Sequence, residues 1–318
     1  MAKVFISDRI PEAAANALSK GGFAVDQYQG RGLISEAELA ASTRDADFLI
    51  ATLSTQVTKA VIDQAHNLKL IANYGAGFNN IDVAAASARH IPVTNTPAVS
   101  TTAVAEVTLG LMLALSHRIV EGDQLMRATG FDGWQPLFFL GHELAGKTLG
   151  IVGAGHIGQA VAKRAAAFDM KILYTQRHQL PATTEQALGA TFVPFDQLIA
   201  QADVITLHAP QTAENFHQFN AGAFKTMKKS ALLINAARGP IIDEAALADA
   251  LAAGDIAGAA LDVYEHEPQV EPRLKTMKNV ILTPHIGNAT VEARDAMAMI
   301  CAENVIKVSR GEAITPVN

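Results

Sequence analysis

The chain has 318 residues, of which 49% are hydrophobic and 18% charged, and its net charge at pH 7 is −6. This composition is that of a globular protein long enough for two domains, and it excludes long disordered segments. The acidic balance argues against a nucleic-acid partner, and the single cysteine, Cys301, excludes an internal disulfide framework.

The first residues do not have the layout of a signal peptide, because the apolar run at residues 4–6 is too short. The most apolar predicted helix, residues 104–115, is interrupted by Glu106 and Thr108 and is shorter than the ~20 residues that a membrane span needs. Together with the lone cysteine, these features lead us to expect a cytoplasmic protein without a membrane partner.

Short apolar runs alternate with helical stretches over the first 97 residues. Strands are predicted at residues 4–6, 23–28, 48–52, 69–74 and 92–95, and helices at 12–20, 35–42 (with a capping box of Ser35 and Glu38), 59–65 and 83–89. This alternation predicts a parallel sheet covered by helices on both faces, whose ligands bind beyond the carboxyl ends of the strands. Two loops follow there, Leu53 with Ser54 and residues 75–77. Backbone N–H groups of the second loop could hold a carboxylate, although a turn that needs flexible residues explains it equally well.

A second array of strands and helices follows. Thr101 or Thr102 can cap a long helix that continues to about Met126, with Glu106 in its first turn, and the only tryptophan, Trp134, lies in the next loop. Strands are predicted at residues 148–152, 171–175, 204–207, 231–235, 257–263 and 280–283. The predicted helices include residues 159–168, 195–200, 221–227, 244–253 and 290–309.

The stretch GKTLGIVGAGHIG, residues 146–158, is the strongest single motif of the chain. Gly153, Gly155 and Gly158 form G-x-G-x-x-G between a predicted strand and a predicted helix. In a dinucleotide-binding fold the first glycine permits the tight turn, the second lets backbone approach a pyrophosphate, and the third lets helix pack on strand. The phosphates then meet free N–H groups at the helix N-terminus. A glycine-rich turn in another kind of α/β protein is the alternative.

Three late strands end in ionisable residues, which places these at the same sheet edge as the glycine motif. Arg238 follows one strand, Asp262 and Glu267 another, and His285 the last. Arginine offers a planar fork of donors to a carboxylate and its adjacent carbonyl, histidine can supply a proton, and a nearby carboxylate favours the charged histidine. Taken singly, each has a structural explanation. No spacing of histidines and acids predicts a metal site, and no nucleophile motif is present.

At this point the chain resembles the D-isomer-specific 2-hydroxyacid dehydrogenases, and most of all their glyoxylate/hydroxypyruvate reductase branch. The matching stretches are NYGAGFNNID (73–82), VTNTP (93–97), FLGHELAGKTLGIVGAGHIG (139–158), LINAARG (233–239), GAALDVYEHEP (258–268) and LTPHIG (282–287). The resemblance implies Arg238 as substrate binder, His285 as acid/base and Glu267 as its orienting partner. It also implies that Leu53, Ala76 and Gly77 bind substrate, the last two through backbone N–H. For the cofactor it implies Gly153, Gly155, His156, Ile157, Gly158, Thr175, Gln176, Arg177, Pro210, Ala236, Arg238, Asp262 and His285.

The family's architecture is two doubly wound parallel-sheet domains around a cleft. The resemblance implies a discontinuous, flavodoxin-like substrate domain at residues 1–97 and 289–318, and a Rossmann cofactor domain at residues 98–288. The C-terminal helix then packs on the N-terminal domain. The usual assembly is a homodimer, in which Trp134 would reach the substrate cleft of the opposite subunit; packing within its own domain is the alternative.

Two departures bear on specificity. Relatives that prefer NAD carry Asp or Glu after the second strand of the cofactor domain, whereas residues 174–178 here read YTQRH. Arg177, with Thr175 or Gln176, could instead meet a 2′-phosphate, so we expect NADPH as the cofactor, with NADH possible. The phosphoglycerate branch carries arginines in the loop after the third strand, where this chain has Thr52, Leu53 and Ser54. The end of the chain at Asn318 also leads us to expect no appended regulatory domain, and on both grounds we do not expect phosphoglycerate as the substrate.

We therefore expect an enzyme that reduces a small 2-oxo acid, such as glyoxylate or hydroxypyruvate, to the D-hydroxy acid. Two alternatives stay open from sequence. One is a reductase of a longer acid, such as 2-ketogluconate or a branched 2-oxo acid, with a pocket set by side chains around Leu53 and Phe78. The other is a non-catalytic NAD-sensing protein that resembles the corepressors built on this fold.

Overall fold

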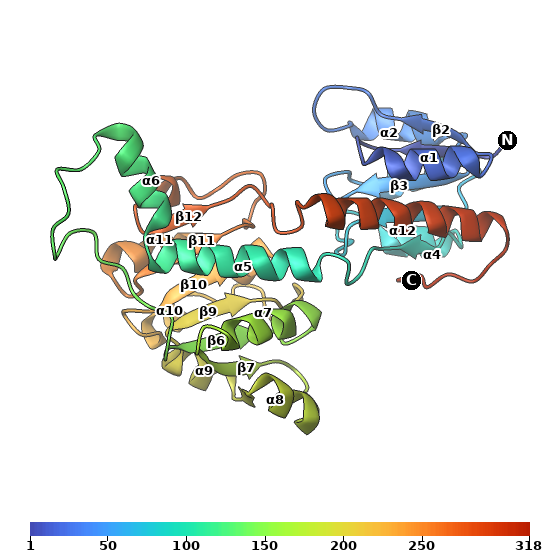
Figure 1. The fold of residues 1–318 in the computed structure, drawn as a ribbon. Helices are drawn as coiled ribbons and strands as arrows, with labels where there is room; N and C mark the ends of the chain where they lie inside the picture. The colour runs from blue at the N-terminus through green and yellow to red at the C-terminus, as the bar shows by residue number, and fades with distance from the viewer. The chain divides into compact units, whose positions relative to one another are not determined.

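The computed structural model describes all residues 1–318, and the chain divides into two compact units (Figure 1). The first unit comprises Met1–Ser100 and Ala289–Asn318, and the second comprises Thr101–Asn288. Each unit contains one parallel sheet with helices on both faces, which confirms the predicted α/β class.

The first unit is built on a five-stranded sheet in the order β2-β1-β3-β4-β5. All four pairings are parallel. The strands are β1 (Lys3–Ile6), β2 (Ala24–Gln27), β3 (Phe48–Thr52), β4 (Leu70–Tyr74) and β5 (Val93–Thr94). They agree with the predicted strands to within two residues at each end. The strand order reverses between β1 and β3, so the ends of these two strands flank the position where ligands of such sheets bind.

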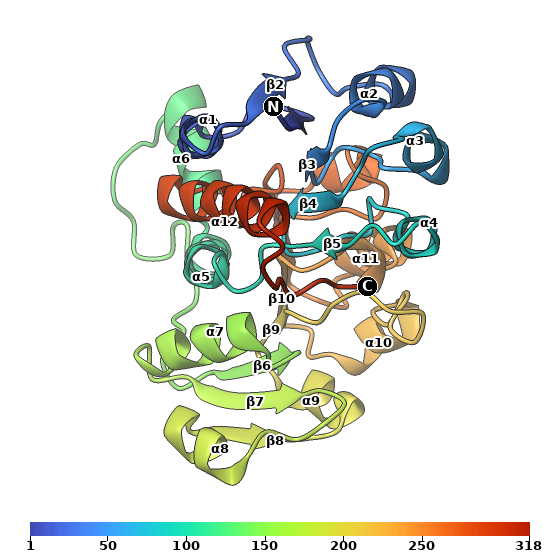
Figure 2. The same cartoon turned by 90° about the vertical axis from the view of Figure 1, so that its right-hand side faces the viewer.

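Five helices cover the two faces of this sheet: α1 (Glu12–Lys20), α2 (Glu36–Thr43), α3 (Lys59–Gln64), α4 (Val83–Ala88) and α12 (Val291–Ser309). Helices α1 and α12 lie side by side on one face, over side chains such as Val4 and Ile50 (Figure 2). Helices α2, α3 and α4 pack on the other, over Phe5 and Leu49. The capping box of Ser35 is present as predicted.

The second unit contains a seven-stranded sheet in the order β12-β11-β10-β9-β6-β7-β8. All pairings are again parallel. The strands are β6 (Thr148–Val152), β7 (Lys171–Thr175), β8 (Ala190–Phe192), β9 (Val204–Leu207), β10 (Leu232–Asn235), β11 (Gly258–Leu261) and β12 (Val280–Leu282). The short edge strand β8 and the helix before it, α8 (Ala182–Leu188), were not predicted. Only three residues of β8 pair with β7, too few for a pattern of alternating hydrophobicity.

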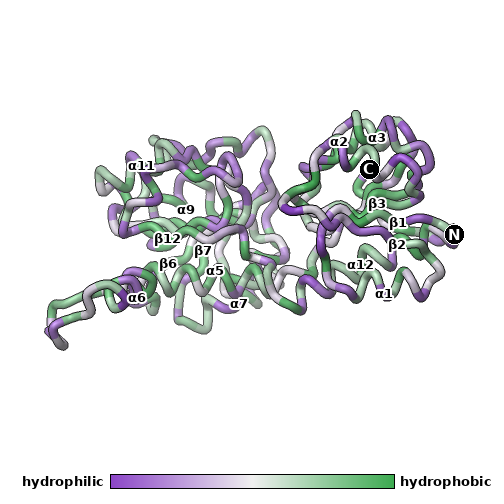
Figure 3. Tube along the Cα trace, turned by 90° about the horizontal axis from the view of Figure 1, so that it is seen from above, coloured by the Kyte–Doolittle hydropathy of each residue, from purple (hydrophilic) through white to green (hydrophobic).

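The helices of the second unit also lie in two layers. They are α5 (Thr101–Ser116), α6 (Ile119–Ala128), α7 (His156–Ala166), α9 (Phe195–Gln201), α10 (Ala221–Thr226) and α11 (Glu244–Ala253), with 3₁₀ turns η1 (Gly239–Ile241) and η2 (Pro272–Thr276). One core packs α5 and α7 on the sheet, and the other packs α9, α10 and α11 on the opposite face. Helix α5 is hydrophobic over most of its length, as expected for a helix in a core (Figure 3).

The predicted single helix ending near Met126 is wrong. The helix ends at Ser116, because Arg118 adopts a left-handed conformation (φ 57°) and the carbonyl of Ser116 accepts a hydrogen bond from the N–H of His142 at 2.8 Å. Thr101 lies within α5, and Glu106 is not in its first turn. No single helix is long and apolar enough to cross a membrane; α5 and α6 meet that length only when taken together across a 61° bend.

Gly158 should be required for the packing of α7 on β6. A Cβ at this position would lie 2.2 Å from the carbonyl oxygen of Gly153, a backbone atom that cannot rotate aside. We expect Gly158→Ala to lower the free energy of unfolding by roughly 1–3 kcal/mol, as measured by urea denaturation. Gly110→Ala is the matched control, because a Cβ there meets no atom within 4 Å and should stabilise by about 0.5–1 kcal/mol. Equal effects of the two substitutions would contradict this account.

Candidate active site in the second unit

The loops that follow β6, β9, β10, β11 and β12 lie at one edge of the seven-stranded sheet, because all these strands are parallel. The strand order reverses between β6 and β9, which is where ligands of doubly wound sheets bind. The glycine motif follows β6 and therefore lies at this reversal. Arg238, Glu267 and His285 lie on loops after β10, β11 and β12, at the same edge as predicted.

The glycine motif has the geometry that a bound pyrophosphate requires. Gly153 has a left-handed backbone (φ 95°), and a Cβ there would lie 2.5 Å from the backbone nitrogen of Ala209, after β9. A Cβ on Gly155 would meet nothing within 4 Å, so the space beside the N-terminus of α7 is open. The first N–H groups of a helix such as α7 have no partner within the helix and favour an anion. His156 and Ile157 are the first residues of α7.

The end of β7 is tied to the glycine motif by Gln176. Its Oε1 accepts a hydrogen bond from the N–H of Ala154 at 3.0 Å, and its Nε2 donates to the carbonyl of His178 at 2.7 Å. The side-chain amide of Gln176 thus holds the loop in shape. Arg177 is exposed, and no carboxylate lies in this loop.

A further polar group borders this edge at the end of β9. His208 lies next to Gly153, and burial lowers the pKa of its imidazole to about 3, so the ring is neutral at physiological pH. Its Nε2 lies 3.0 Å from the hydroxyl of Thr206, whereas its buried Nδ1 has no hydrogen-bond partner. Two positions further, the exposed Pro210 accepts a hydrogen bond from Asn215 through its carbonyl. An unpaired buried polar atom next to an open glycine-rich loop fits a polar ligand of the nicotinamide nucleotide class.

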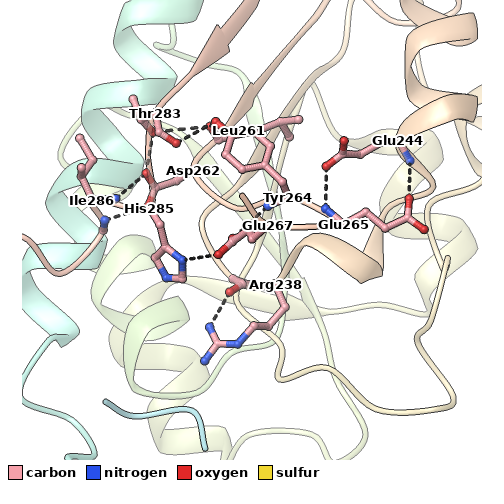
Figure 4. Close-up of polar contacts among 12 residues, drawn as sticks. Arg238, Glu244, Leu261, Asp262, Tyr264, Glu265, Glu267, Thr283, His285 and Ile286 are labelled. Carbon is pink, nitrogen blue, oxygen red and sulfur yellow. Dashed lines mark hydrogen bonds and ion pairs between the residues drawn. The ribbon is translucent and has the colours of Figure 1, made fainter. Parts of the chain in front are cut away.

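His285 and Glu267 form the central ion pair of the site. The Nδ1 of His285 lies 3.0 Å from Oε2 of Glu267, whose Oε1 accepts from the N–H of Tyr264 at 3.1 Å (Figure 4). No protein group bonds Nε2 of His285. Burial alone would raise the pKa of Glu267, but the hydrogen bond and charge of His285, the Tyr264 N–H and the charge of Arg238 hold it below its usual range. Glu267 is therefore ionised at neutral pH.

Arg238 lies on the turn after β10. Burial lowers the pKa of its guanidinium, while the charge of Glu267 opposes that shift; arginine stays charged in either case. Its Nη1 donates to the carbonyl of Ala237 at 2.6 Å (Figure 4). The turn itself is held by the buried Asn235, which bonds the carbonyl of Arg238 and the N–H of Ala237 at 3.0 Å each. Ala236 lies within this turn and is half-buried.

Asp262 holds the turn that carries His285. Its carboxylate accepts hydrogen bonds from the hydroxyl of Thr283 (2.6 Å) and from the N–H groups of Ile286 (2.8 Å) and Gly287 (2.7 Å). His285 has a left-handed backbone (φ 53°), a strained conformation that persists only where the surroundings enforce it. Both oxygens of Asp262 are thus engaged by this turn, although a carboxylate offers about four lone-pair sites and one remains for a ligand.

The remaining predicted substrate residues Leu53, Ala76 and Gly77 lie in the first unit, and its structure brings them together. A Cβ on Gly75 would lie 2.2 Å from Cδ2 of Leu53. The carbonyls of residues 75 and 77 accept from the side-chain amide of Asn73 at 3.2 and 2.6 Å, and that of Ala76 accepts from Asn95 at 2.7 Å. Because N–H and C=O point in opposite directions across a trans peptide, the N–H groups of residues 76–78 are directed away from these amides. Such N–H groups suit an anion.

Sequence reasoning missed the residues that hold these loops. Asn73, Asn95, Asn235 and Tyr264 act through contacts that are remote in sequence or specific to one turn. Tyr264 donates its hydroxyl to the carbonyl of Thr283 at 2.8 Å and so joins the ends of β11 and β12. The only available signal was their position inside the matched motifs. Trp134 lies on the loop after α6 and the residue is 83% exposed, so it does not pack in the core of its own unit.

Comparisons with known proteins agree with this geometry. A family model described as the NAD-binding domain of D-isomer-specific 2-hydroxyacid dehydrogenases matches residues 109–287. A protein of Staphylococcus epidermidis named as a 2-hydroxyacid dehydrogenase is 54% identical over 312 residues, which cover 98% of each chain. The solved structure of TT0316 from Thermus thermophilus has a TM-score of 0.94 at 39% identity and covers 99% of this chain and 100% of that one.

An NADPH-dependent glyoxylate/hydroxypyruvate reductase from Sinorhizobium meliloti, solved with citrate, has a TM-score of 0.87 at 32% identity, and the match covers 100% of this chain and 97% of that one. A second structure of that protein holds NADP and malonate. These comparisons confirm the resemblance at the level of the family. The chain belongs to the family of D-isomer-specific 2-hydroxyacid dehydrogenases, with the family's NAD-binding domain in its second unit.

Proposed function

We propose that this dehydrogenase reduces a small 2-oxo acid of the glyoxylate or hydroxypyruvate type to the D-2-hydroxy acid, with NADPH as the preferred cofactor. The observation that carries the proposal is the His285–Glu267 pair, at 3.0 Å, next to the charge of Arg238. The similarity to the Sinorhizobium reductase supports the substrate class and the cofactor. In this proposal residues 1–97 and 289–318, which lie within the first unit, form the substrate domain, and residues 98–288 form the cofactor domain.

Arg238 binds the substrate in this mechanism. Its guanidinium can donate two parallel hydrogen bonds to a carboxylate and an adjacent carbonyl oxygen, and it polarises that carbonyl. Partial burial strengthens these bonds, because the local dielectric is lower than in water. Leu53 remains a proposed substrate contact. The outward N–H groups of Ala76 and Gly77 remain proposed carboxylate-binding groups, supported by the way Asn73 and Asn95 hold the carbonyls of that loop.

His285 supplies the proton. A bound nicotinamide nucleotide supplies the hydride for the carbonyl carbon. Because Nδ1 of His285 is engaged by Glu267, its Nε2 is the nitrogen that donates to the substrate oxygen. The ionised Glu267 fixes the orientation of the His285 ring through this contact. Asp262 keeps the His285 turn in place and remains a proposed contact of the nicotinamide amide.

The cofactor is proposed to lie along the edge between the glycine motif and the β7 loop. Gly153, Gly155, His156, Ile157 and Gly158 would hold the pyrophosphate. Thr175, Gln176 and Arg177 would face the adenosine ribose, and Pro210 and Ala236 would complete the binding surface. Since the amide of Gln176 is already engaged by Ala154 and His178, the exposed Arg177 is the main candidate for a 2′-phosphate.

A homodimer is part of the proposal. The segment from α6 through the following loop exposes several large apolar side chains: Ile119, Val120, Met126, Phe131, Trp134, Leu137, Phe138 and Leu140. An apolar stretch of this extent is typical of a surface that a partner covers. We propose that a second copy covers it and that Trp134 reaches the substrate site of that copy.

Turnover on a panel of 2-oxo acids tests the function and the role of Arg238 together. The parent protein should oxidise NADPH with glyoxylate or hydroxypyruvate faster than with longer or branched acids. Arg238→Lys keeps the charge but cannot present two donors in one plane, and loss of a charged hydrogen bond of roughly 1.5–3 kcal/mol should lower kcat/KM about ten- to a hundredfold. Steady-state kinetics measure both effects.

Arg310→Lys is the control for this experiment, because Arg310 is an exposed arginine of the first unit, near Glu312. It should leave kcat/KM unchanged. A parent protein without turnover on any acid would contradict the enzymatic function and favour a binding protein. Nearly full efficiency of Arg238→Lys would contradict the bidentate contact.

Glu267→Gln should change the pH dependence of reduction more than cofactor affinity. The protonated imidazole of His285 loses its anionic partner, so the alkaline limb of the kcat profile should move to lower pH. The profile is measured under conditions in which chemistry limits the rate. An alkaline limb at the parent position would remove Glu267 from this role.

Arg177→Ala should raise the KM for NADPH about ten- to a hundredfold, the effect of losing a charge-assisted pair of roughly 1.5–3 kcal/mol, and leave the KM for NADH nearly unchanged. Lys171→Ala is the matched control, since Lys171 is an exposed cation at the start of β7, whereas Arg177 follows the end of that strand. Equal efficiency of the parent with the two cofactors would already refute the proposed preference.

A further inference from the structure

The segment that carries Glu267, residues 264–271, has little regular structure of its own. It connects β11 to η2, and within it the N–H of Gln269 donates to the carbonyl of His266 at 2.8 Å. A side chain from another element holds it at two points. Oε1 of Glu244 accepts from the N–H of Glu265 at 2.7 Å (Figure 4). Oε2 of Glu244 accepts from the N–H of Glu271 at 3.0 Å. One carboxylate thus bonds the backbone on both sides of Glu267.

The contact is reciprocal. Oε2 of Glu265 accepts from the N–H of Glu244 at 3.3 Å (Figure 4). Oε1 of Glu265 lies 2.6 Å from Nε2 of His217, on the loop between β9 and α10. The ring of His217 stacks on that of Phe216 with 3.9 Å between centroids. The Glu267 segment is therefore tied to α11 and to a second loop at the same sheet edge.

The buried carboxyl group of Glu244 does not cap its own helix. Glu244 is 6% exposed and is the first residue of α11, where the helix dipole favours a negative group. However, the N-cap role is already filled by Asp243, whose Oδ1 accepts from the N–H of Ala246 at 2.9 Å. A buried carboxylate is costly unless its oxygens are hydrogen-bonded, and the bonds that Glu244 makes are directed to the Glu267 segment.

We propose that Glu244 is a positioning residue for the reduction. By fixing the N–H groups of Glu265 and Glu271, it sets the course of the segment so that the carboxylate of Glu267 meets Nδ1 of His285. The effect passes through two contacts, Glu244 to Glu265 and Glu267 to His285, joined by the short chain from Glu265 to Glu267. The proposal rests on the proposed roles of Glu267 and His285.

The test compares Glu244→Gln, Glu244→Asp and Glu244→Ala. Glutamine keeps the size but turns one acceptor into a donor that faces an N–H, so one of the two backbone contacts is lost. For Glu244→Gln we expect kcat to fall on the order of ten- to a hundredfold, as for other small displacements of catalytic groups, with the alkaline limb moved to lower pH. The KM for NADPH should stay within about twofold of the parent. Glu244→Asp, which keeps both acceptors on a shorter stem, should recover part of kcat.

Hydrogen–deuterium exchange of residues 264–271 gives a readout that does not require turnover. In Glu244→Gln and Glu244→Ala these amides should exchange faster, while amides in the middle of α11 keep the parent rate. Asp249→Asn is the matched control: Asp249 lies on the same helix, but its carboxylate is exposed and pairs with Arg273. It should change neither the exchange of this segment nor the pH profile.

The outcomes separate the positioning role from a structural one. A Glu244→Gln protein with a lower urea midpoint but the parent kcat, alkaline limb and exchange rates would overturn the proposal. Failure of the parent protein to turn over any 2-oxo acid would instead refute the proposed function. In that case the exchange rates still decide whether Glu244 fixes the segment.

Discussion

The site depends on one constraint, that every strand of the seven-stranded sheet runs parallel to its neighbours. Parallel alignment sends the loops after β6, β10, β11 and β12 to the same edge, although they are spread over about half of the chain. An antiparallel strand at β11 would carry Asp262 and Glu267 to the opposite edge. Parallel sheets need cover on both faces, which explains why strands such as β9 and β10 are apolar without alternation. The hydrophobic layers thereby fix where the polar groups meet.

The carboxylates at this edge differ in what they bond, and this difference separates their roles. Asp262 and Glu244 are nearly fully buried, and their oxygens are bonded by backbone N–H groups and a hydroxyl. Glu267 is partly exposed, and one of its oxygens pairs with Nδ1 of His285. The first two therefore determine backbone geometry, whereas the third acts on a titratable ring. The motif at residues 258–268 contains Asp262 and Glu267 but does not distinguish these uses, and Glu244 lies outside every matched motif.

Sequence reasoning could predict the elements whose hydrophobic pattern is local. The bounds of β3, β6, β7, β9, α1 and α11 were predicted to the residue, and so was the edge shared by Arg238, Glu267 and His285. The break between α5 and α6 was not predictable, because it depends on the contact between Ser116 and His142, from a loop that follows in the chain. The role of Glu244 was not predictable either, because a glutamate in the first turn of a helix has an ordinary local explanation. Its bonds to Glu265 and Glu271 appear only in the fold.

In the two units, side chains bond different backbone groups of the loops: carbonyls in the first unit and N–H groups in the second. In the first unit, side-chain amides of Asn73 and Asn95 take the carbonyls of residues 75–77, which leaves N–H groups directed outward. In the second unit, carboxylates take the N–H groups of loops after β11 and β12, so backbone there offers few donors. Beside these two loops, donors to an anion must then come from side chains, and Arg238 and His285 are the groups placed to provide them. The free N–H groups at the start of α7 belong to a different loop of the same edge. An amide side chain that bonds the carbonyls of a loop thus leaves backbone N–H groups for an anion. A carboxylate that bonds the N–H groups of a loop leaves anion binding to neighbouring side chains.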